Sequence, residues 1–131
     1  MSRITDFLND AGIFYLATVD STGQPKVRPL GAHIEMDGKV LFGVGEFKDV
    51  CKQLKAEPRT EIVACRNDGH WLRYTGKAVF ETDPKYAKAM IAAAHLDEIY
   101  NEKTGNKLAV FRIEDATAVD MTIIGKGESI L

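Results

Sequence analysis

Residues 43–48 (GVGEFK) lie between a strand pattern and a helix pattern and contain the residue types that bind anions. Glycines at such a turn let backbone N–H groups approach a ligand without interference from a Cβ atom. The positive end of the helix dipole favours negative charge there, and Lys48 adds a mobile cation. Arg28, in the preceding strand pattern, supplies a second cation. The segment therefore predicts a site for a phosphate group.

The composition restricts what kind of anion this is. The chain has 131 residues, of which 45% are hydrophobic, and we expect one compact domain over residues 1–131. The formal charge of −2 and the pI near 5.9 provide no general attraction to nucleic acid or to anionic lipid. We therefore expect no nucleic-acid partner and no membrane partner, and a small anionic ligand that is recognised locally.

Cysteine and histidine positions indicate neither a disulfide framework nor a metal site. Cys51 and Cys65 lie in a helix pattern and a strand pattern without metal-ligand spacing, and free cysteines are usually small buried hydrophobic residues. No apolar stretch approaches the roughly 18 residues of a membrane span, and no apolar signal segment precedes the first element. We expect a reduced, cytoplasmic protein.

The elements that must position Arg28 and Lys48 follow from hydrophobic periodicity and turn residues. Asp37-Gly38 and Asn67-Asp68-Gly69 predict hairpin turns, Ser2 predicts a helix N-cap, and Pro84 predicts a helix start. The predicted strands cover residues 13–19, 25–36, 39–42, 60–66, 70–81, 107–113 and 118–124, and the main helices cover residues 47–56 and 84–95. This pattern predicts a mainly β (α+β) fold, a six- to seven-stranded antiparallel split β-barrel with short flanking helices.

Four segments, in this order and spacing, give the chain a family resemblance. They are residues 14–19 (FYLATV), 27–30 (VRPL), 47–54 (FKDVCKQL) and 71–78 (WLRYTGKA). Together they resemble the pyridoxamine 5′-phosphate oxidase-like flavoproteins, and the resemblance covers nearly the whole chain. It implies an FMN-binding split barrel that forms a homodimer, with the flavin at the interface between the subunits.

The resemblance also assigns roles to individual residues. Arg28, Pro29 and Leu30 match the segment that lies along the flavin ring, and Lys48 matches the lysine that binds the FMN phosphate. Gly45 belongs to the same phosphate-binding turn.

Two further residues, Trp71 and Arg73, match the strand that faces the cleft between the subunits, and they are expected to contact the partner's flavin.

Two positions of the turn depart from the family pattern. Relatives commonly carry Ser or Thr there, whereas this chain has Val44 and Phe47. Because a neutral hydrogen bond contributes roughly 0.5–1.5 kcal/mol, the loss of two hydroxyls weakens FMN binding by about 1–3 kcal/mol. The total of about 8 kcal/mol that micromolar affinity requires can still come from cations, backbone amides and ring burial.

Simpler interpretations of the same residues remain open. Lys48 is also a typical solvated helix lysine, and Arg28 before Pro29 is also a typical edge-strand charge. Trp71 is also a typical packing residue of a core or a subunit interface.

The function that follows is a small FMN-dependent oxidoreductase, in which the open ring face meets a nicotinamide or a small oxidised substrate. Reduction of a flavin, a quinone or a nitro compound fits this function. The C-terminal segment has one lysine and no arginine or histidine to hold a substrate phosphate, which argues against pyridoxamine phosphate as the substrate. Two alternatives stay open: a non-catalytic flavin-binding or electron-carrier protein, and a relative that uses haem, a deazaflavin or no cofactor at all. Haem would need an axial ligand, for which His70 and His95 are the candidates.

Overall fold

The computed structural model describes residues 2–131, which form eight strands and three helices. The strands are β1 (Phe14–Val19), β2 (Pro25–Leu30), β3 (His33–Met36), β4 (Lys39–Gly45), β5 (Arg59–Cys65), β6 (His70–Glu81), β7 (Leu108–Thr122) and β8 (Gly127–Ser129). The helices are α1 (Arg3–Ala11), α2 (Asp49–Ala56) and α3 (Pro84–Ala93).

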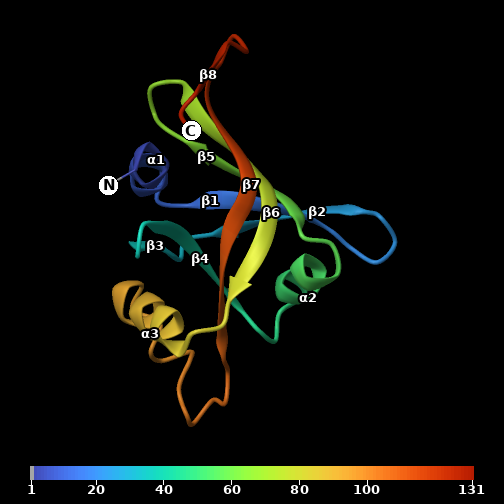
Figure 1. The fold of residues 1–131 in the computed structure, drawn as a ribbon, viewed down its shortest axis with the longest axis vertical. Helices are drawn as coiled ribbons and strands as arrows, with labels where there is room; N and C mark the ends of the chain where they lie inside the picture. The colour runs from blue at the N-terminus through green and yellow to red at the C-terminus, as the bar shows by residue number, and fades with distance from the viewer. Residues whose placement is uncertain (1) are drawn as a thin grey trace.

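The strands form one antiparallel sheet in the order β2-β1-β5-β6-β7-β4-β3, and the short β8 pairs with β7. The sheet curves into a half-barrel, and its two end strands, β2 and β3, follow one another in the chain (Figure 1). Helix α1 packs on β5 and β3, α2 on β1 and β4, and α3 on β3 and β7. The prediction of a mainly β, antiparallel split barrel with short flanking helices is confirmed.

Helix α1 closes one end of the barrel, for reasons that the sequence contains. The Ser2 side chain accepts a hydrogen bond from the backbone N–H of Thr5, and Gly12, with a φ of 73°, ends the helix. The side chains of Ile4, Phe7 and Leu8 share one face and are buried in the main core. No helix in residues 2–131 has both the length and the apolar character that crossing a bilayer would require.

Three predicted boundaries are wrong. The strand predicted over residues 25–36 breaks at Gly31 and Ala32, so that β2 pairs with β1 while β3 pairs with β4. The two strands predicted over residues 107–113 and 118–124 are one strand, β7, which bends at Asp115, where φ is 50°. Strand β4 continues to Gly45, and α2 begins at Asp49, which makes Lys48 the N-cap residue.

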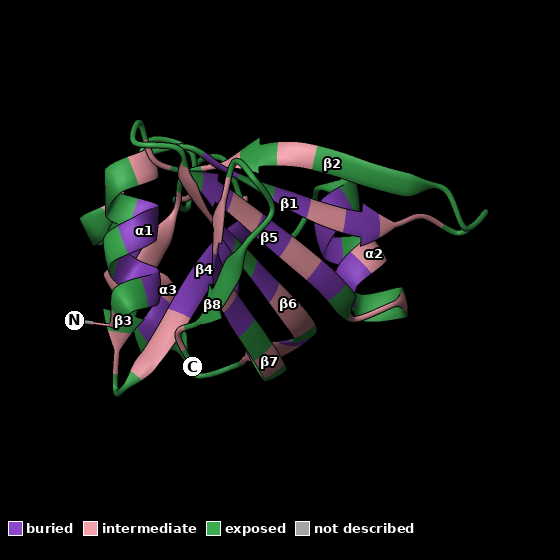
Figure 2. Ribbon diagram, turned by 90° about the horizontal axis from the view of Figure 1, so that it is seen from above, coloured by how far each residue is buried: buried purple, intermediate pink, exposed green. Residues whose placement is uncertain are grey.

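The two faces of the sheet differ in burial. Along β1 and β5, buried residues alternate with less buried ones, whereas β2 is largely exposed (Figure 2). Phe14, Leu16 and Ile62 point into the main core and are fully buried. On the outer face Tyr15 lies between Pro29 and Val63, since it is the register partner of both.

Candidate functional site

A cavity of about 700 Å³ lies where β2, the end of β4 and the start of α2 meet. This size is typical of small-molecule and cofactor sites. Residues from both predicted regions line it together, although they are far apart in the sequence. The lining comprises Arg28, Pro29, Leu30, Gly31, Ala32, Gly43, Val44, Gly45, Lys48, Asp49, Val50, Ala94, Leu96, Ile99, Tyr100 and Leu108.

Arg28 spans from β2 to α2 and is held by four hydrogen bonds, the longest of which runs from Nη1 to the Lys26 carbonyl oxygen (3.5 Å). Its Nη1 donates to the Leu16 carbonyl oxygen (3.1 Å) and to Thr18 Oγ1 (2.7 Å), and its Nη2 donates to Gln53 Oε1 (2.8 Å). Partial burial lowers the pKa of the guanidinium, and the nearby charge of Asp49 opposes this shift. Because a guanidinium has five N–H donors, Nε and one Nη2 donor remain for a ligand.

Lys48 stands at the beginning of α2 with an exposed side chain that makes no capping hydrogen bond. The first N–H groups of a helix have no partner within the helix, and their dipoles favour an anion. Of the backbone donors around the turn, those of Glu46 and Lys48 are already bonded to Lys107 O and Gly45 O. Because the Lys48 side chain is exposed and makes no capping hydrogen bond, its ammonium group is the mobile cation of this corner of the cavity.

Gly45 lets the Phe47 and Tyr100 side chains approach the backbone at this corner, where a Cβ atom would collide with them. A Cβ atom placed on Gly45 would lie 2.8 Å from Phe47 Cε1 and 3.0 Å from the Tyr100 hydroxyl oxygen. The Phe47 and Tyr100 rings lie near one another, with centroids 6.4 Å apart. Phe47 is 51% exposed and does not line the cavity, whereas buried Val44 does.

Trp71 and Arg73 lie away from this cavity, on the outer face of β6. The Arg73 guanidinium lies over the Trp71 ring at 4.9 Å from its centroid, and Arg73 Nε is 3.6 Å from Glu61 Oε2. Neither residue lines this cavity. Tyr100, by contrast, lines the cavity. Sequence reasoning missed it, because it belongs to a polar loop 55 residues beyond Gly45.

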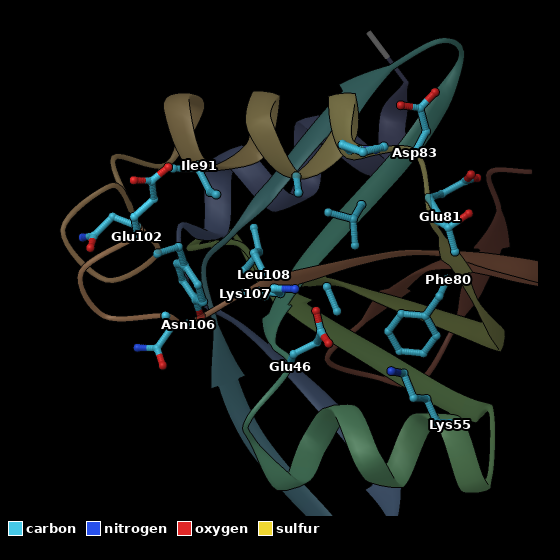
Figure 3. Close-up of a pocket in the computed structure, with 18 residues that line it drawn as sticks. Glu46, Lys55, Phe80, Glu81, Asp83, Ile91, Glu102, Asn106, Lys107 and Leu108 are labelled. Atoms are coloured by element: carbon cyan, nitrogen blue, oxygen red, sulfur yellow. The ribbon is translucent and has the colours of Figure 1, made fainter.

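A second cavity, of about 830 Å³, lies between α2 and α3 (Figure 3). Its apolar surface includes Phe80 and Leu108, and Lys55 extends from α2 so that its Nζ lies 5.4 Å from the centre of the Phe80 ring. Acidic side chains, among them Glu46 and Glu102, dominate its rim. The larger cavity also has two cations, Lys55 and Lys107, but four acidic residues line it with them. The smaller one has Arg28, Lys48 and the N-terminus of α2, with Asp49 as the acidic residue of its lining, and therefore suits an anion better.

The histidines do not contribute to the smaller cavity. His70 Nδ1 lies 2.7 Å from Asp120 Oδ1 on another part of the sheet, and this carboxylate raises the His70 pKa. His95 is exposed, and His33 is a partly buried residue whose Nδ1 has no partner. Within residues 2–131, no group of three or more His, Cys, Asp or Glu side chains is arranged to hold a metal ion.

Comparison with solved structures supports the fold over almost the full length. A NimC/NimA family protein from Clostridium acetobutylicum is 29% identical and superposes with a TM-score of 0.86, covering 98% of this chain and 89% of its own. A protein related to general stress protein 26 of B. subtilis, of the pyridoxinephosphate oxidase family and also from C. acetobutylicum, is 11% identical, with a TM-score of 0.70 and coverages of 96% and 89%.

A haem-binding protein from Mycobacterium smegmatis shares the fold at 17% identity and a TM-score of 0.69, covering 94% of this chain and 54% of its own. Comparison with curated proteins gives no match. The family model described as pyridoxamine 5′-phosphate oxidase matches residues 2–120. This chain therefore belongs to the pyridoxamine 5′-phosphate oxidase family.

Proposed function

We propose that this protein binds FMN in the 700 Å³ cavity and acts as a small FMN-dependent oxidoreductase. The single observation that carries the proposal is the convergence of Arg28–Leu30, Gly43–Gly45 and Lys48 on one cavity of suitable size. These segments come from three different elements, and only folding brings them together. Family membership supports the same cofactor.

The cavity lining combines the two kinds of surface that a mononucleotide needs. Lys48 and the N-terminal amides of α2 provide positive potential for the phosphate. Pro29 and Leu30, with Leu96 and Ile99 from the loop after α3, provide apolar surface for a planar ring. The residues present therefore fit FMN.

Flavin, when bound, supplies hydride or electron transfer. The protein's part is to hold and tune it. The free N–H donors of Arg28 stabilise negative charge that a bound ring gains next to the cavity wall. Thr18 and Gln53 hold the guanidinium in place, so that it does not have to reorganise when this charge develops. We propose that the open side of the cavity admits a nicotinamide or a small oxidised substrate such as a flavin, a quinone or a nitro compound.

The cavity lining favours flavin over haem. Haem iron needs an axial ligand, most often histidine, and no histidine among residues 2–131 lines this cavity. His70 already bonds with Asp120, and His95 is exposed and does not line the cavity.

We propose further that the protein is a homodimer whose subunits meet through the outer face of β1, β2, β5 and β6. Tyr15 and Val27 are 45% and 66% exposed on this face, and Trp71 and Arg73 lie on it as well. Pro29 belongs both to this face and to the cavity wall. A partner docked here would bring its Trp71 and Arg73 toward a cavity that they cannot reach in their own subunit.

The test is the visible spectrum of the purified protein, followed by FMN titration of wild type, Lys48→Ala and Lys52→Ala. Lys52 is the matched control, since it is an exposed lysine of the same helix outside the cavity. A lost charged hydrogen bond contributes about 1.5–3 kcal/mol, so Lys48→Ala should weaken FMN binding about 10- to 100-fold, and Lys52→Ala should leave it unchanged.

Equal FMN affinity in wild type and Lys48→Ala would show that the phosphate lies elsewhere. A wild-type protein that does not bind FMN would overturn the proposal as a whole. Turnover of reduced nicotinamide with an added acceptor separates an enzyme from an electron carrier, because a carrier binds FMN without catalysing this reaction.

A further inference from the structure

The phosphate-binding corner proposed above contains no hydroxyl from its own segment, since residues 43–48 (GVGEFK) lack Ser, Thr and Tyr. A hydroxyl reaches this corner from elsewhere in the chain. The Tyr100 hydroxyl oxygen lies 3.0 Å from the position that a Cβ atom of Gly45 would occupy, and Tyr100 lines the same cavity as Lys48. A hydroxyl this close requires residue 45 to have no side chain.

The Tyr100 hydroxyl is free to bind a ligand. Within residues 2–131 it makes no hydrogen bond, and burial of the ring raises the pKa of the phenol, which keeps the hydroxyl protonated as a donor at neutral pH. The hydroxyl is not among the buried side-chain atoms that lack a partner, so it remains accessible to a molecule in the cavity that Tyr100 lines. The Phe47 ring lies against the Tyr100 ring and restricts its movement, and this limits where the hydroxyl oxygen can lie.

The loop that carries Tyr100 is held by a dense set of hydrogen bonds. The Tyr100 backbone N–H donates to the Leu96 carbonyl oxygen (3.0 Å), and the carbonyl oxygen of Ile99 accepts from Thr104 Oγ1 (2.7 Å) and Asn106 Nδ2 (3.2 Å). Directly after this loop, the Lys107 carbonyl oxygen accepts from the N–H of Glu46 (2.9 Å), which ties the loop to the turn. Tyr100 is thus placed on a support whose position relative to the turn is fixed.

We propose that the Tyr100 hydroxyl is a phosphate-binding donor, which acts with Lys48 to hold the charged end of the mononucleotide and supplies the hydroxyl that residues 43–48 lack. The inference rests on the proposed FMN site and adds a residue to it. It also assigns a ligand-selecting role, because a donor at this point favours phosphorylated flavins over riboflavin.

The test compares the affinities of FMN and riboflavin in wild type, Tyr100→Phe and Tyr86→Phe, measured by quenching of flavin fluorescence. Tyr100→Phe keeps the ring that packs against Phe47 and removes only the hydroxyl. Tyr86→Phe is the matched control, because its hydroxyl donates to Asp37 and lies outside the cavity. We expect Tyr100→Phe to weaken FMN binding about 10-fold or more while riboflavin affinity stays within about two-fold, since hydrogen bonds to charged groups are the stronger ones.

Equal losses for FMN and riboflavin, or no loss for FMN, would overturn the role of Tyr100 while leaving the FMN site in place. Failure of the wild type to bind FMN would instead overturn the proposed function. The double variant Lys48→Ala/Tyr100→Phe gives a second measure: two groups on one phosphate should couple, so that the combined loss differs from the product of the single losses. A combined loss equal to that product would count against a shared ligand group.

Discussion

At the scale of single residues, Arg28, Thr18 and Gln53 form a polar network beneath the candidate site. The Thr18 hydroxyl donates to Gln53 Oε1 and accepts from Arg28 Nη1, while Arg28 Nη2 donates to the same Gln53 oxygen. One amide oxygen on α2 therefore fixes the guanidinium on β2 and a buried hydroxyl on β1. Since buried polar groups are costly when unpaired, this network also determines where α2 lies against the barrel.

Replacing Gln53 by Ala should destabilise the protein by about 1–3 kcal/mol, because Thr18 and Arg28 each lose a partner in a partly buried place. FMN binding should weaken as well, since the guanidinium is no longer fixed. Urea unfolding measures the first effect and flavin titration the second. Gln24→Ala is the control, because that side chain lies in an exposed turn; equal stability of the two variants would contradict the role of the network.

The sequence could predict this site only in part. Glycines next to Lys48 and an Arg-Pro pair are local signals, and the structure places both at one cavity. The internal partners of Arg28 could not be predicted, because Thr18 and Gln53 are separated from it by 10 and 25 residues and only the folded barrel brings them together. No sequence pattern indicates Tyr100, since its position beside Gly45 depends on how the loop after α3 folds against residues 43–48.

At the scale of elements, local rules predicted the helices well and the strand boundaries less well. The cap at Ser2 and the Pro84 start are short-range features and are confirmed. The break at Gly31 and Ala32 depends on a change of pairing partner from β1 to β4, which periodicity does not contain. The two strands predicted over residues 107–113 and 118–124 are one strand for a similar reason: the long partner β6 pairs with both halves of β7, and periodicity does not contain this pairing.

Helix α1 is tied to β3 by Glu35, and this link predicts a pH dependence. Glu35 Oε1 accepts from Thr5 Oγ1 (2.6 Å) and from the Ser2 N–H (3.0 Å). The Thr5 hydroxyl contributes most to the lowering of the Glu35 pKa from 4.5 to about 2. A lowered carboxyl pKa stabilises the folded state above the unfolded pKa, and this contribution is lost as the pH falls from about 4.5 to about 2.

The stability of the wild type should therefore fall more steeply between pH 5 and pH 2 than that of Glu35→Gln, whose amide does not titrate. Urea midpoints measured across this range provide the comparison. Glu102→Gln, a change of the same kind on an exposed loop, should follow the wild type. Parallel pH profiles for wild type and Glu35→Gln would show that the link does not stabilise the fold.

At the scale of the whole molecule, the outer face of the sheet carries a largely apolar row of residues, in which Arg73 is the charged member and lies beside Glu61. The row formed by Pro29, Tyr15, Val63, Arg73 and Val119 crosses β2, β1, β5, β6 and β7, since each residue is the register partner of the next. Extended apolar patches of this kind mark interaction surfaces. Because a two-fold interface pairs the same patch on both copies, a charged residue substituted at the centre of this patch appears twice in the interface.

Tyr15→Glu should therefore convert the proposed dimer into a monomer. The substitution places two carboxylates near the two-fold contact, where like charges repel and the burial of a carboxylate is costly. Sedimentation velocity at micromolar concentration should show the change in mass, and FMN should bind more weakly, because the partner's side chains no longer close the cavity. Ile123→Glu is the control: Ile123 is 87% exposed at a turn away from this row, so the dimer should persist. A wild type that sediments as a monomer under these conditions would exclude the shared cleft, and the cavity would then have to hold FMN with the residues of one chain alone.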